Sequence, residues 1–273
     1  MYQYQYGFIG SGNMAEAFVR GILQKSATQP QQVLCCDIDP RRLEALAQAF
    51  PGIATTNDLA DMNACRILLL CVKPAQIAAV CEKLHGLLSS EEHILISVAA
   101  GIPMAVLQRH LPGRKVVRAM PNTPALVGAG ATGYCVDSTL SESRRREVQE
   151  LFEAVGVAFE LEEKQLDVVT ALSGGGPAYI CLVTEALADA GVRLGLSRSV
   201  AQALAAQTLL GTGSMILQTG EHPAVLREKV CSPGGTTIEG ICALEMAAVR
   251  GAFAEAVAAA YDKAKLLGEV YNG

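Results

Sequence analysis

A glycine pattern near the N-terminus is the feature of this chain most directly tied to chemistry. Residues 4–9 are predicted as a strand and lead straight into GSGNMA, residues 10–15, where a helical pattern begins. In this context Gly10 permits a tight turn, Gly12 lets the backbone approach a pyrophosphate, and Ala15 lets the helix lie close to the strand. Free N–H groups at the helix start then bind the anion. The pattern predicts a dinucleotide site, with an ordinary tight turn as the alternative.

Charged residues follow the second predicted strand, residues 33–36. Asp37 comes directly after it, and an acidic residue in this place binds the adenosine ribose hydroxyls and favours NAD. Arg41 and Arg42 follow at once, and a guanidinium there can bind the 2′-phosphate of NADP. An exposed helix face is the alternative role for both arginines. The residues leave the choice between NAD and NADP open.

Three further strands end in segments that can shape a binding site. These segments are CVKP (71–74), SVAAG (97–101) and AMPNTP (119–124). Carboxyl ends of parallel strands meet at one edge of the sheet, where ligands bind in such folds. The small residues of SVAAG leave room for a flat ring, and the two prolines of AMPNTP make a rigid loop. For Lys73 an ordinary solvated lysine is the alternative.

Two glycine-rich motifs, LSGGGPAY (172–179) and CSPGGTTI (231–238), each precede a long predicted helix. Glycines and threonine hydroxyls at a helix start expose backbone donors that suit a carboxylate or a phosphate. A helix–helix turn in a tightly packed bundle is the alternative. No lysine occurs between residues 165 and 228. This absence argues against the dehydrogenases that use a helix-borne lysine to reduce a ketone.

The predicted secondary structure, which must position these motifs, changes near residue 161 from alternating strands and helices to helices alone. Before it, short apolar strands alternate with helices, which is typical of a doubly wound, mostly parallel sheet. Strands are expected at 4–9, 33–36, 66–71, 94–98, 115–119, 132–136 and 157–161, and helices at 14–24, 40–50, 75–88 and 142–155. After residue 162 only helices are expected, at 177–194, 197–218, 236–248 and 251–267, with stops at Gly195 and Gly220 and an N-cap at Ser197.

The predicted fold class is therefore α/β followed by all-α. Residues 1–161 would form a dinucleotide-binding Rossmann domain, and residues 162–273 a helical domain for substrate binding and dimerisation. The helical half is apolar on all sides, which requires more packing partners than one small bundle supplies. We therefore expect a homo-oligomer whose interface lies in this half.

Composition narrows the class of protein. The 273 residues are 51% hydrophobic and 18% charged, with a net charge of −5, which favours a large aliphatic core and disfavours nucleic-acid or anionic-membrane partners. Nine cysteines without C-x-x-C spacing indicate reduced thiols. The four histidines lack metal-ligand spacing, so no metal is expected. A start without a basic segment and short aliphatic runs predict a cytoplasmic protein that does not span a membrane.

Taken in order, the motifs resemble those of the pyrroline-5-carboxylate reductase family: FIGSGNMAEA, CVKPAQ, ISVAAGI, RAMPNTPA, ALSGGGPAY and CSPGGTTIEG. The resemblance covers essentially the whole chain, and the last motif is the most diagnostic. It implies reduction of the cyclic imine of 1-pyrroline-5-carboxylate to L-proline, the last step of proline biosynthesis. It also implies NADP(H), with NAD(H) often accepted, and an interlocked dimer that can assemble into a decamer.

The resemblance also implies roles for individual residues. Together with the motif reading, the predicted cofactor residues are Gly10, Ser11, Gly12, Asn13, Met14, Asp37, Arg41, Asn57, Val72, Lys73, Pro74, Ala99 and Ala100. The predicted substrate residues are Met120, Pro121, Ser232, Gly234, Gly235, Thr236 and Thr237. Gly175 is a departure, because the family usually has serine there. The Thr237 hydroxyl is the candidate catalytic group, placed to hydrogen-bond the imine nitrogen.

Two rival functions are open at this point. One is a reductase of the same two-domain plan that acts on a hydroxy acid or a sugar acid, which the missing lysine and the SPGGTT motif disfavour. The other is a non-catalytic sensor of the NADP redox state, which has no need of a second glycine-rich cradle. An iminium accepts hydride without a strong general acid, so the imine reaction fits a site without an obvious histidine or lysine acid.

Overall fold

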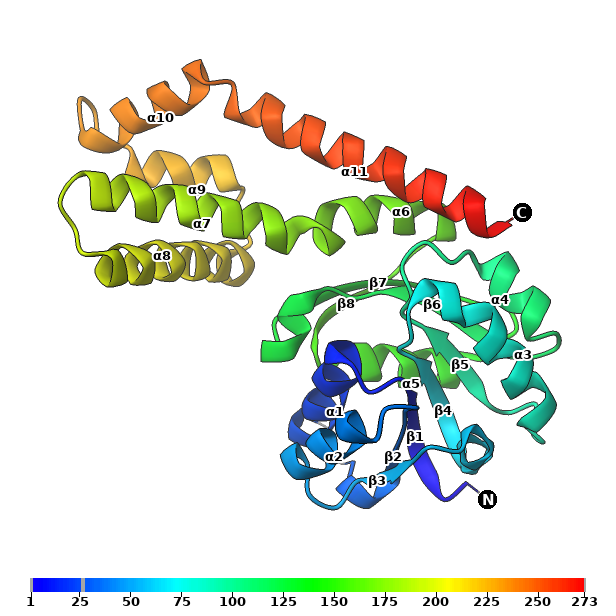
Figure 1. Cartoon of the computed structure of the whole chain (residues 1–273). Helices are drawn as coiled ribbons and strands as arrows, with labels where there is room; N and C mark the ends of the chain where they lie inside the picture. The colour runs from blue at the N-terminus through cyan, green and yellow to red at the C-terminus, as the bar shows by residue number, and fades with distance from the viewer. Residues whose placement is uncertain (1, 26–27, 273) are drawn as a thin grey trace. The chain divides into compact units, whose positions relative to one another are not determined.

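The computed structural model describes residues 2–25 and 28–272 and divides into two compact units (Figure 1). The first unit contains the chain up to Gly175 and again from Ala260 onward. The second unit contains Gly176–Ala259. The long last helix contributes residues to both units because it continues across Ala260.

An eight-stranded sheet with the order β3-β2-β1-β4-β5-β6-β7-β8 forms the centre of the first unit. Its strands are β1 (Tyr4–Ile9), β2 (Val33–Cys36), β3 (Ala54–Thr56), β4 (Cys65–Leu70), β5 (Ile94–Ser97), β6 (Lys115–Met120), β7 (Gly130–Val136) and β8 (Gly156–Glu160). Only the β6–β7 pair is antiparallel among the strands described. The predicted doubly wound, mostly parallel sheet is thus confirmed, and the seven predicted strands shift only slightly at their ends.

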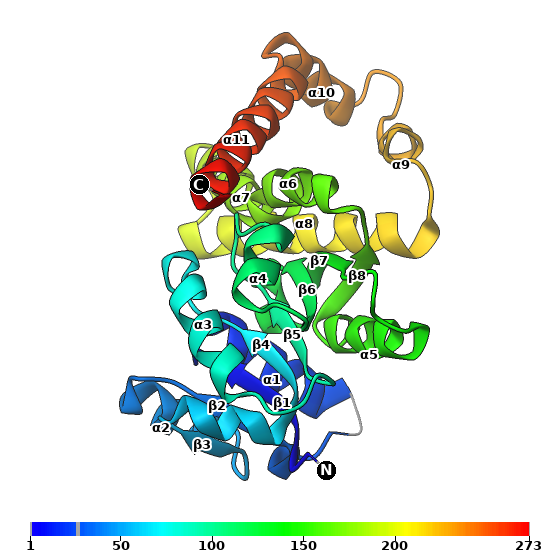
Figure 2. The same ribbon diagram turned by 90° about the vertical axis from the view of Figure 1, so that its right-hand side faces the viewer.

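Helices cover both faces of this sheet. One face carries α1 (Asn13–Lys25), α2 (Pro40–Ala49) and α5 (Glu142–Glu153), and the other carries α3 (Ile77–Leu87) and α4 (Met104–His110). Figure 2 shows α5 beside β8, and α2 and β3 at the other end of the sheet. In β4, Ile67 and Leu69 face the first layer while Leu68 and Leu70 face the second. This two-sided burial explains why β4 is apolar throughout.

Short helical turns complete the first unit. They are η1 (Pro30–Gln32), η2 (Leu59–Ala64), η3 (Pro74–Gln76), η4 (Thr123–Val127), η5 (Glu163–Gln165), the single turn α6 (Leu166–Val169) and the π-helical turn Thr170–Gly174. The strand β3 and the helix α4 had not been predicted. Both are short, and β3 is partly polar, so neither has enough periodicity to be recognised.

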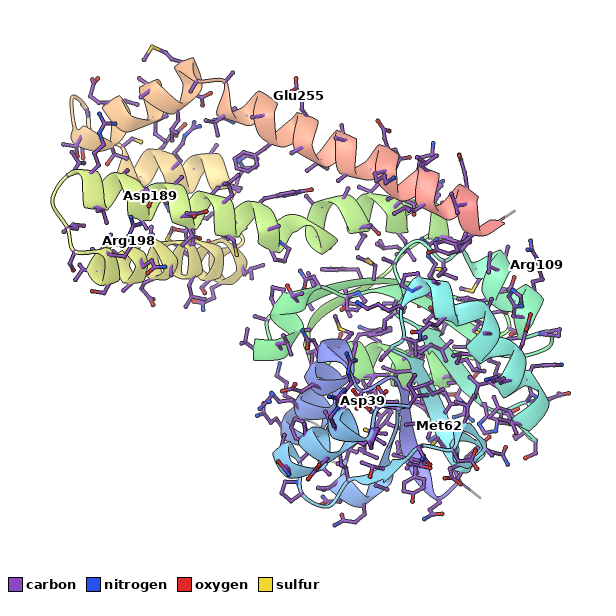
Figure 3. The ribbon with its side chains drawn as sticks, viewed as in Figure 1. Asp39, Met62, Arg109, Asp189, Arg198 and Glu255 are labelled. Atoms are coloured by element: carbon purple, nitrogen blue, oxygen red, sulfur yellow. The ribbon has the colours of Figure 1, made fainter. Side chains whose placement is uncertain are left out.

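The second unit is entirely helical. Its elements are α7 (Gly176–Arg193), α8 (Arg198–Thr219), α9 (Pro223–Val230), α10 (Thr236–Met246) and the first part of α11 (Val249–Asn272). The predicted stops are confirmed, since Gly195 and Gly220 follow α7 and α8 with φ of 108° and 65°. Ser197 occupies the predicted N-cap position, although its hydroxyl interacts with that of Ser199 and makes no capping bond to the helix backbone. Beside this turn, Asp189 and Arg198 form an ion pair (Figure 3).

The second unit has a very small core of its own. Among the residues described for it, those that are buried are Ala188, Ala201, Ala205 and Leu226. Large apolar side chains of this unit that are 50–83% exposed include Ile180, Leu182, Leu187, Leu204, Leu210, Leu217, Val230, Leu244 and Met246. An apolar surface of this extent is typical of helices that another chain or a lipid covers.

Two helical segments are long and apolar enough to cross a membrane by length and composition. They are Glu163–Arg193 and Arg198–Thr219, with mean hydropathies of 1.4 and 1.3. The sequence-based expectation rested only on uninterrupted runs of aliphatic residues, which are short throughout the chain. In these segments alanine, glycine and threonine break the runs while the average remains high.

A buried arginine ties β6 to the helical segment that follows β8. Arg118 donates to a Glu163 carboxylate oxygen at 3.0 Å and to an Asp167 carboxylate oxygen at 3.1 Å. The same Glu163 oxygen accepts from the backbone N–H of Met104, the first residue of α4, at 2.6 Å. One side chain therefore links a strand and two helical elements.

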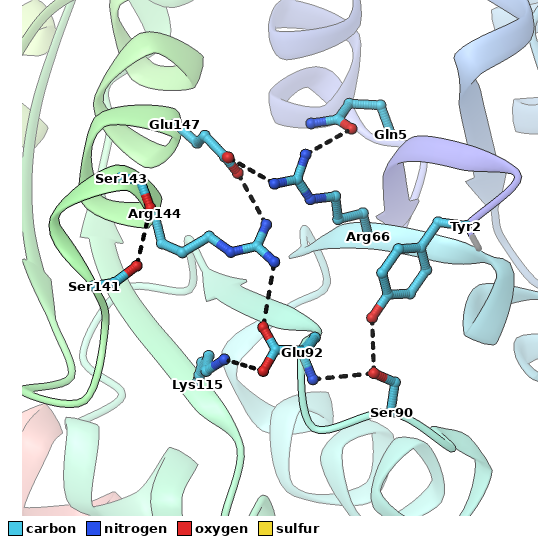
Figure 4. A network of polar contacts seen from close by, with 10 residues as sticks. All are labelled: Tyr2, Gln5, Arg66, Ser90, Glu92, Lys115, Ser141, Ser143, Arg144 and Glu147. Atoms are coloured by element: carbon cyan, nitrogen blue, oxygen red, sulfur yellow. Dashed lines mark hydrogen bonds and ion pairs between the residues drawn. The ribbon is translucent and has the colours of Figure 1, made fainter.

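A second network of polar contacts lies near the amino ends of β4 and β6 (Figure 4). Glu92 accepts from Lys115 at 2.8 Å and from Arg144 at 3.3 Å. Arg144 also bonds to Glu147, which accepts from Arg66 at 2.6 Å. The bonds join α5 to β4, to β6 and to the loop before β5, so they fix this helix on the sheet. The salt bridges are partly exposed, which limits what each contributes.

We predict that Arg118→Ala lowers the free energy of unfolding by about 2 kcal/mol, because it leaves two partly buried carboxylates without their cation. The matched control is Arg146→Ala. Arg146 and Glu142 lie 3.5 Å apart with both side chains more than 70% exposed, and the loss there should stay below about 0.5 kcal/mol. Urea unfolding at one protein concentration measures both. Equal losses in the two variants would contradict the prediction.

Candidate active site

The turn between β1 and α1 has the geometry of a dinucleotide-binding turn. Gly10 has a φ of 94°, and a Cβ at this position would lie 2.8 Å from the carbonyl oxygen of Cys71. Only glycine fits both the conformation and the space. The helix α1 begins at Asn13, and the N–H of Glu16 bonds to the Gly12 carbonyl at 3.0 Å. The N–H groups of the first turn therefore have no partner within the helix.

A cavity of about 1660 Å³ opens at this turn, within the first unit. The predicted cofactor residues that line it are Gly10, Ser11, Gly12, Asn13, Met14, Asp37, Asn57, Val72, Lys73, Pro74, Ala99 and Ala100. They come from the carboxyl ends of β1, β2, β4 and β5 and from the segment after β3. The structure thus brings together the predicted cofactor residues, with Arg41 as the exception.

The environment of the Ser11 hydroxyl indicates whether this cavity suits a dinucleotide. Ser11 is 7% exposed, and its Oγ has no hydrogen-bond partner among the residues described. A buried hydroxyl without a partner is costly, and a phosphate oxygen at the turn is an acceptor that would satisfy it. The residues present therefore fit a pyrophosphate.

Asp37 holds the turn as well as lining the cavity. One carboxylate oxygen accepts from the N–H of Ser11 at 2.6 Å, and the other accepts from the N–H of Asp39 at 2.9 Å. Each oxygen has a second lone pair, so ribose hydroxyls can still be bound. The sequence predicted a ribose ligand at this position but not the carboxylate's role in joining the ends of β1 and β2.

The two arginines after β2 point to different places. Asp39 caps α2 by accepting from the N–H of Arg41 at 3.0 Å, and it also binds the Arg41 guanidinium at 3.1 Å. These hydrogen bonds lower the pKa of Asp39. Arg42 instead lines the cavity, with one guanidinium nitrogen 3.7 Å from the position of a Cβ on Gly12. Arg42, and not the predicted Arg41, is thus the arginine beside the pyrophosphate turn.

Part of the cavity wall is formed by small and apolar groups. Val72, Pro74 and Ala99 line it, and Ala99 is only 5% exposed. Burial raises the pKa of the lining thiol of Cys71 to about 12, so that this cysteine is a neutral thiol and not a nucleophile. An apolar wall without an ionised nucleophile suits the flat ring of a redox cofactor.

The first glycine-rich motif of the helical half has its predicted helix start, because α7 begins at Gly176 with Pro177 in its first turn. The π turn Thr170–Gly174, which comes directly before it, had not been predicted. The N–H of Gly175 bonds to the Thr170 carbonyl at 2.9 Å, so it is not a free donor. Extra residues are accommodated in such a turn without breaking the helix. Composition alone does not distinguish such a π turn from an α-helical turn.

Two predicted substrate residues lie beside this π turn. Pro121 is buried and Met120 is partly buried, at the carboxyl end of β6. The methyl group of Met120 lies 2.6 Å from the position that a Cβ on Gly174 would occupy. Met120 therefore packs directly on Gly174, and the strand end and the π turn form one surface within the first unit.

The second glycine-rich motif has its predicted local structure. Gly234 has a φ of 64°, Gly235 is the N-cap, and α10 begins at Thr236. The N–H of Gly235 bonds to the Ser232 carbonyl at 3.0 Å. Thr237 is partly buried in the first turn of α10, where backbone N–H groups have no partner within the helix. The motif belongs to the second unit.

No group of three or more histidine, cysteine, aspartate or glutamate side chains in residues 2–25 and 28–272 is arranged to hold a metal ion. The polar groups that line the cavity include the backbone amides of the turn, the Ser11 hydroxyl, the Asp37 carboxylate and the Arg42 guanidinium. Such a set binds phosphate and ribose groups.

Comparison with known proteins agrees with both parts of the chain. Residues 163–267 match the family model described as pyrroline-5-carboxylate reductase dimerisation. Residues 5–101 match the model described as NADP oxidoreductase, coenzyme F420-dependent. The first match includes the second glycine-rich motif, and the second includes the cofactor cavity.

Full-length relatives and solved structures agree with these models. The chain is 39% identical over 265 residues to pyrroline-5-carboxylate reductase of Synechocystis, covering 97% of this chain and 98% of the relative. It is 40% identical over 265 residues to that of Methanosarcina acetivorans, covering 96% and 97%.

Among solved structures, a pyrroline-5-carboxylate reductase from Coxiella burnetii superposes with a TM-score of 0.91 at 36% identity, covering 97% of this chain and 98% of that one. The Plasmodium falciparum pyrroline carboxylate reductase with NADP bound superposes with a TM-score of 0.86 at 30% identity, covering 98% and 99%. This chain belongs to the pyrroline-5-carboxylate reductase family.

Proposed function

We propose that this protein is an NAD(P)H-dependent oxidoreductase that reduces 1-pyrroline-5-carboxylate to L-proline, the last step of proline biosynthesis. The observation that carries the proposal is the pairing of an intact dinucleotide cavity with family membership over nearly the whole chain. The substrate is a cyclic imine with a carboxylate. The product is the corresponding secondary amine.

The cofactor is NADP(H), with NAD(H) as a second candidate. The related structure from Plasmodium falciparum contains NADP, which supports this assignment. When bound, NADPH supplies the hydride. The turn at Gly10–Gly12 and the Ser11 hydroxyl would hold the pyrophosphate, and Asp37 and Asn57 would bind the adenosine ribose. Val72–Pro74 and Ala99–Ala100 would position the ring.

The substrate side follows from the chemistry of an imino acid. The N–H groups at the start of α10, with Ser232, Gly234, Gly235 and Thr236, would bind the carboxylate, because a helix N-terminus favours an anion. Met120 and Pro121 would contact the ring. The Thr237 hydroxyl would hydrogen-bond the imine nitrogen. A protonated imine accepts hydride without a strong acid, so positioning supplies most of the catalysis.

The two domains would divide this work. Residues 1–161 would bind the dinucleotide, and residues 162–273 would bind the substrate and form a homodimer. The match to a dimerisation model and the exposed apolar faces of α7 and α8 support a second copy as the cover for these helices. We further propose that the dimers assemble into a larger ring, for example a decamer. The nine free cysteines support a reducing, cytoplasmic location. The net charge of −5 disfavours nucleic-acid and anionic-membrane partners.

We expect the purified protein to oxidise NADPH or NADH only when 1-pyrroline-5-carboxylate is supplied. Absorbance of the reduced nicotinamide measures this directly. Turnover with a hydroxy or keto acid, but none with the imine, would instead support the rival reductase. Cofactor binding without turnover of any of these compounds would support the sensor.

We expect Arg42→Ala to raise the KM for NADPH by about fivefold or more and to raise the KM for NADH less, because only NADPH carries the 2′-phosphate. The matched control is Arg41→Ala, which removes a guanidinium held by Asp39 outside the cavity. It should change neither KM. Equal effects of Arg42→Ala on both cofactors would show that this side chain does not bind the 2′-phosphate.

We expect Thr237→Ala and Thr237→Val to lower kcat by about tenfold, a loss of about 1.4 kcal/mol in the transition state. Both variants keep the backbone donor that faces the carboxylate and lose the hydroxyl. Valine is close to threonine in shape, so a similar loss in both excludes a packing effect. Wild-type turnover in the valine variant would mean that Thr237 only shapes the helix start and that solvent supplies the proton.

A further inference from the structure

One face of β6 contacts the helical segment Glu163–Gly174. Side chains alternate along an extended chain, so residues 118, 120 and 122 share a face. Arg118 binds Glu163 and Asp167, Met120 packs on Gly174, and Asn122 bonds to the carbonyl of Ser173. Both ends of the segment are therefore held by the same strand and the residues that follow it.

The Ser173 carbonyl cannot receive the hydrogen bond that a regular α-helix would supply. In an α-helix it would accept from the N–H of residue 177, but that residue is Pro177, which has no N–H. The side-chain amide of Asn122 donates to this carbonyl at 3.0 Å. The amide of Asn122 thus takes the place of the donor that the proline lacks.

Asn122 is also held in place itself. It is 9% exposed, and its Oδ1 accepts from the N–H of Ala131 in β7 at 2.9 Å. With one donor and one acceptor both engaged, the orientation of its amide is determined. Asn122 therefore joins the ends of β6 and β7 to the π turn.

We infer that Asn122 is a positioning residue for the reduction: its amide holds the π turn against the end of β6, and so holds Met120 and Pro121 where the substrate ring binds. The inference rests on the proposed function. Without this donor the Ser173 carbonyl is left unpaired, and the turn has to shift to satisfy it. Because Met120 lies in direct contact with Gly174, a shift of the turn moves the substrate surface. The cofactor cavity does not include these residues.

The main test is Asn122→Asp, which keeps the size and the acceptor for Ala131 and removes the donor to Ser173. We expect kcat/KM for 1-pyrroline-5-carboxylate to fall by about tenfold or more. The dissociation constant for NADPH, measured by nicotinamide fluorescence, should change by less than about twofold. A substitution that only loosens the fold would weaken both.

The pH dependence provides a second readout. A protonated carboxyl group donates a hydrogen bond, so the new side chain regains the missing donor as pH falls. The ratio of variant to wild-type kcat/KM should therefore rise between about pH 8 and pH 6, since burial places such a group's titration above its ordinary range. A general loss of packing would give a ratio that does not depend on pH.

The matched control is Asn63→Asp. Asn63 uses its Oδ1 to accept from the N–H and hydroxyl of Ser89 at 2.8 and 3.0 Å, and an aspartate keeps both bonds. This exchange should leave kcat/KM at the wild-type value. It shows the effect of an added carboxylate where no donor is lost.

A rescue experiment addresses the missing N–H directly. Asn122→Ala should lose activity, and Pro177→Ala in the same chain should restore part of it, because residue 177 can then donate to Ser173. Wild-type kcat/KM in Asn122→Asp, or no recovery in the double variant, would overturn the inference while leaving the proposed function intact. A wild-type protein that does not reduce the imine would overturn the proposed function itself.

Discussion

Parallel pairing of β1 with both β2 and β4 is the constraint on which the cofactor cavity depends. In this register Ile9 lies opposite Cys36 and Leu70, so the turn at Gly10 lies beside the acidic residue Asp37. The bonds between the ends of the strands follow from that placement. A slip of one residue would turn every side chain of β1 to the opposite face and separate the groups that bind the dinucleotide.

The strand β6 has a comparable role for the helical segment. Its alternation presents Arg118 and Met120 to Glu163–Gly174, and Asn122 continues the pattern beyond the strand end. The helix leaving the first unit is thereby held at both ends before it continues into α7. The second unit depends on a different contribution, because its own buried residues are few and its large apolar side chains are exposed. Burial of those side chains by another copy would supply the hydrophobic stabilisation that the unit itself lacks.

Most of the secondary structure could be predicted because its signals are local. The run ILLLCV predicts a strand buried on both faces, and Gly195 and Gly220 predict the ends of α7 and α8. Short elements such as β3, α4 and α9 were not predicted, since a few residues carry too little periodicity to be recognised. The glycines of LSGGG precede α7 as predicted, but the π turn Thr170–Gly174 was not predicted, because its residue types are equally compatible with an α-helical turn.

The sequence by itself determined the dinucleotide turn, the order of the motifs and the start of α10 at Thr236, since each depends on neighbouring residues. Only the tertiary structure decided that Arg42 lines the cavity while Arg41 is held by Asp39. It also decided that Asn122 serves the carbonyl of Ser173. Partners of this kind lie far apart along the chain or differ only in the direction of a side chain. Spacing in the sequence carries no information about which of two adjacent side chains faces a ligand, or which distant donor replaces a missing N–H.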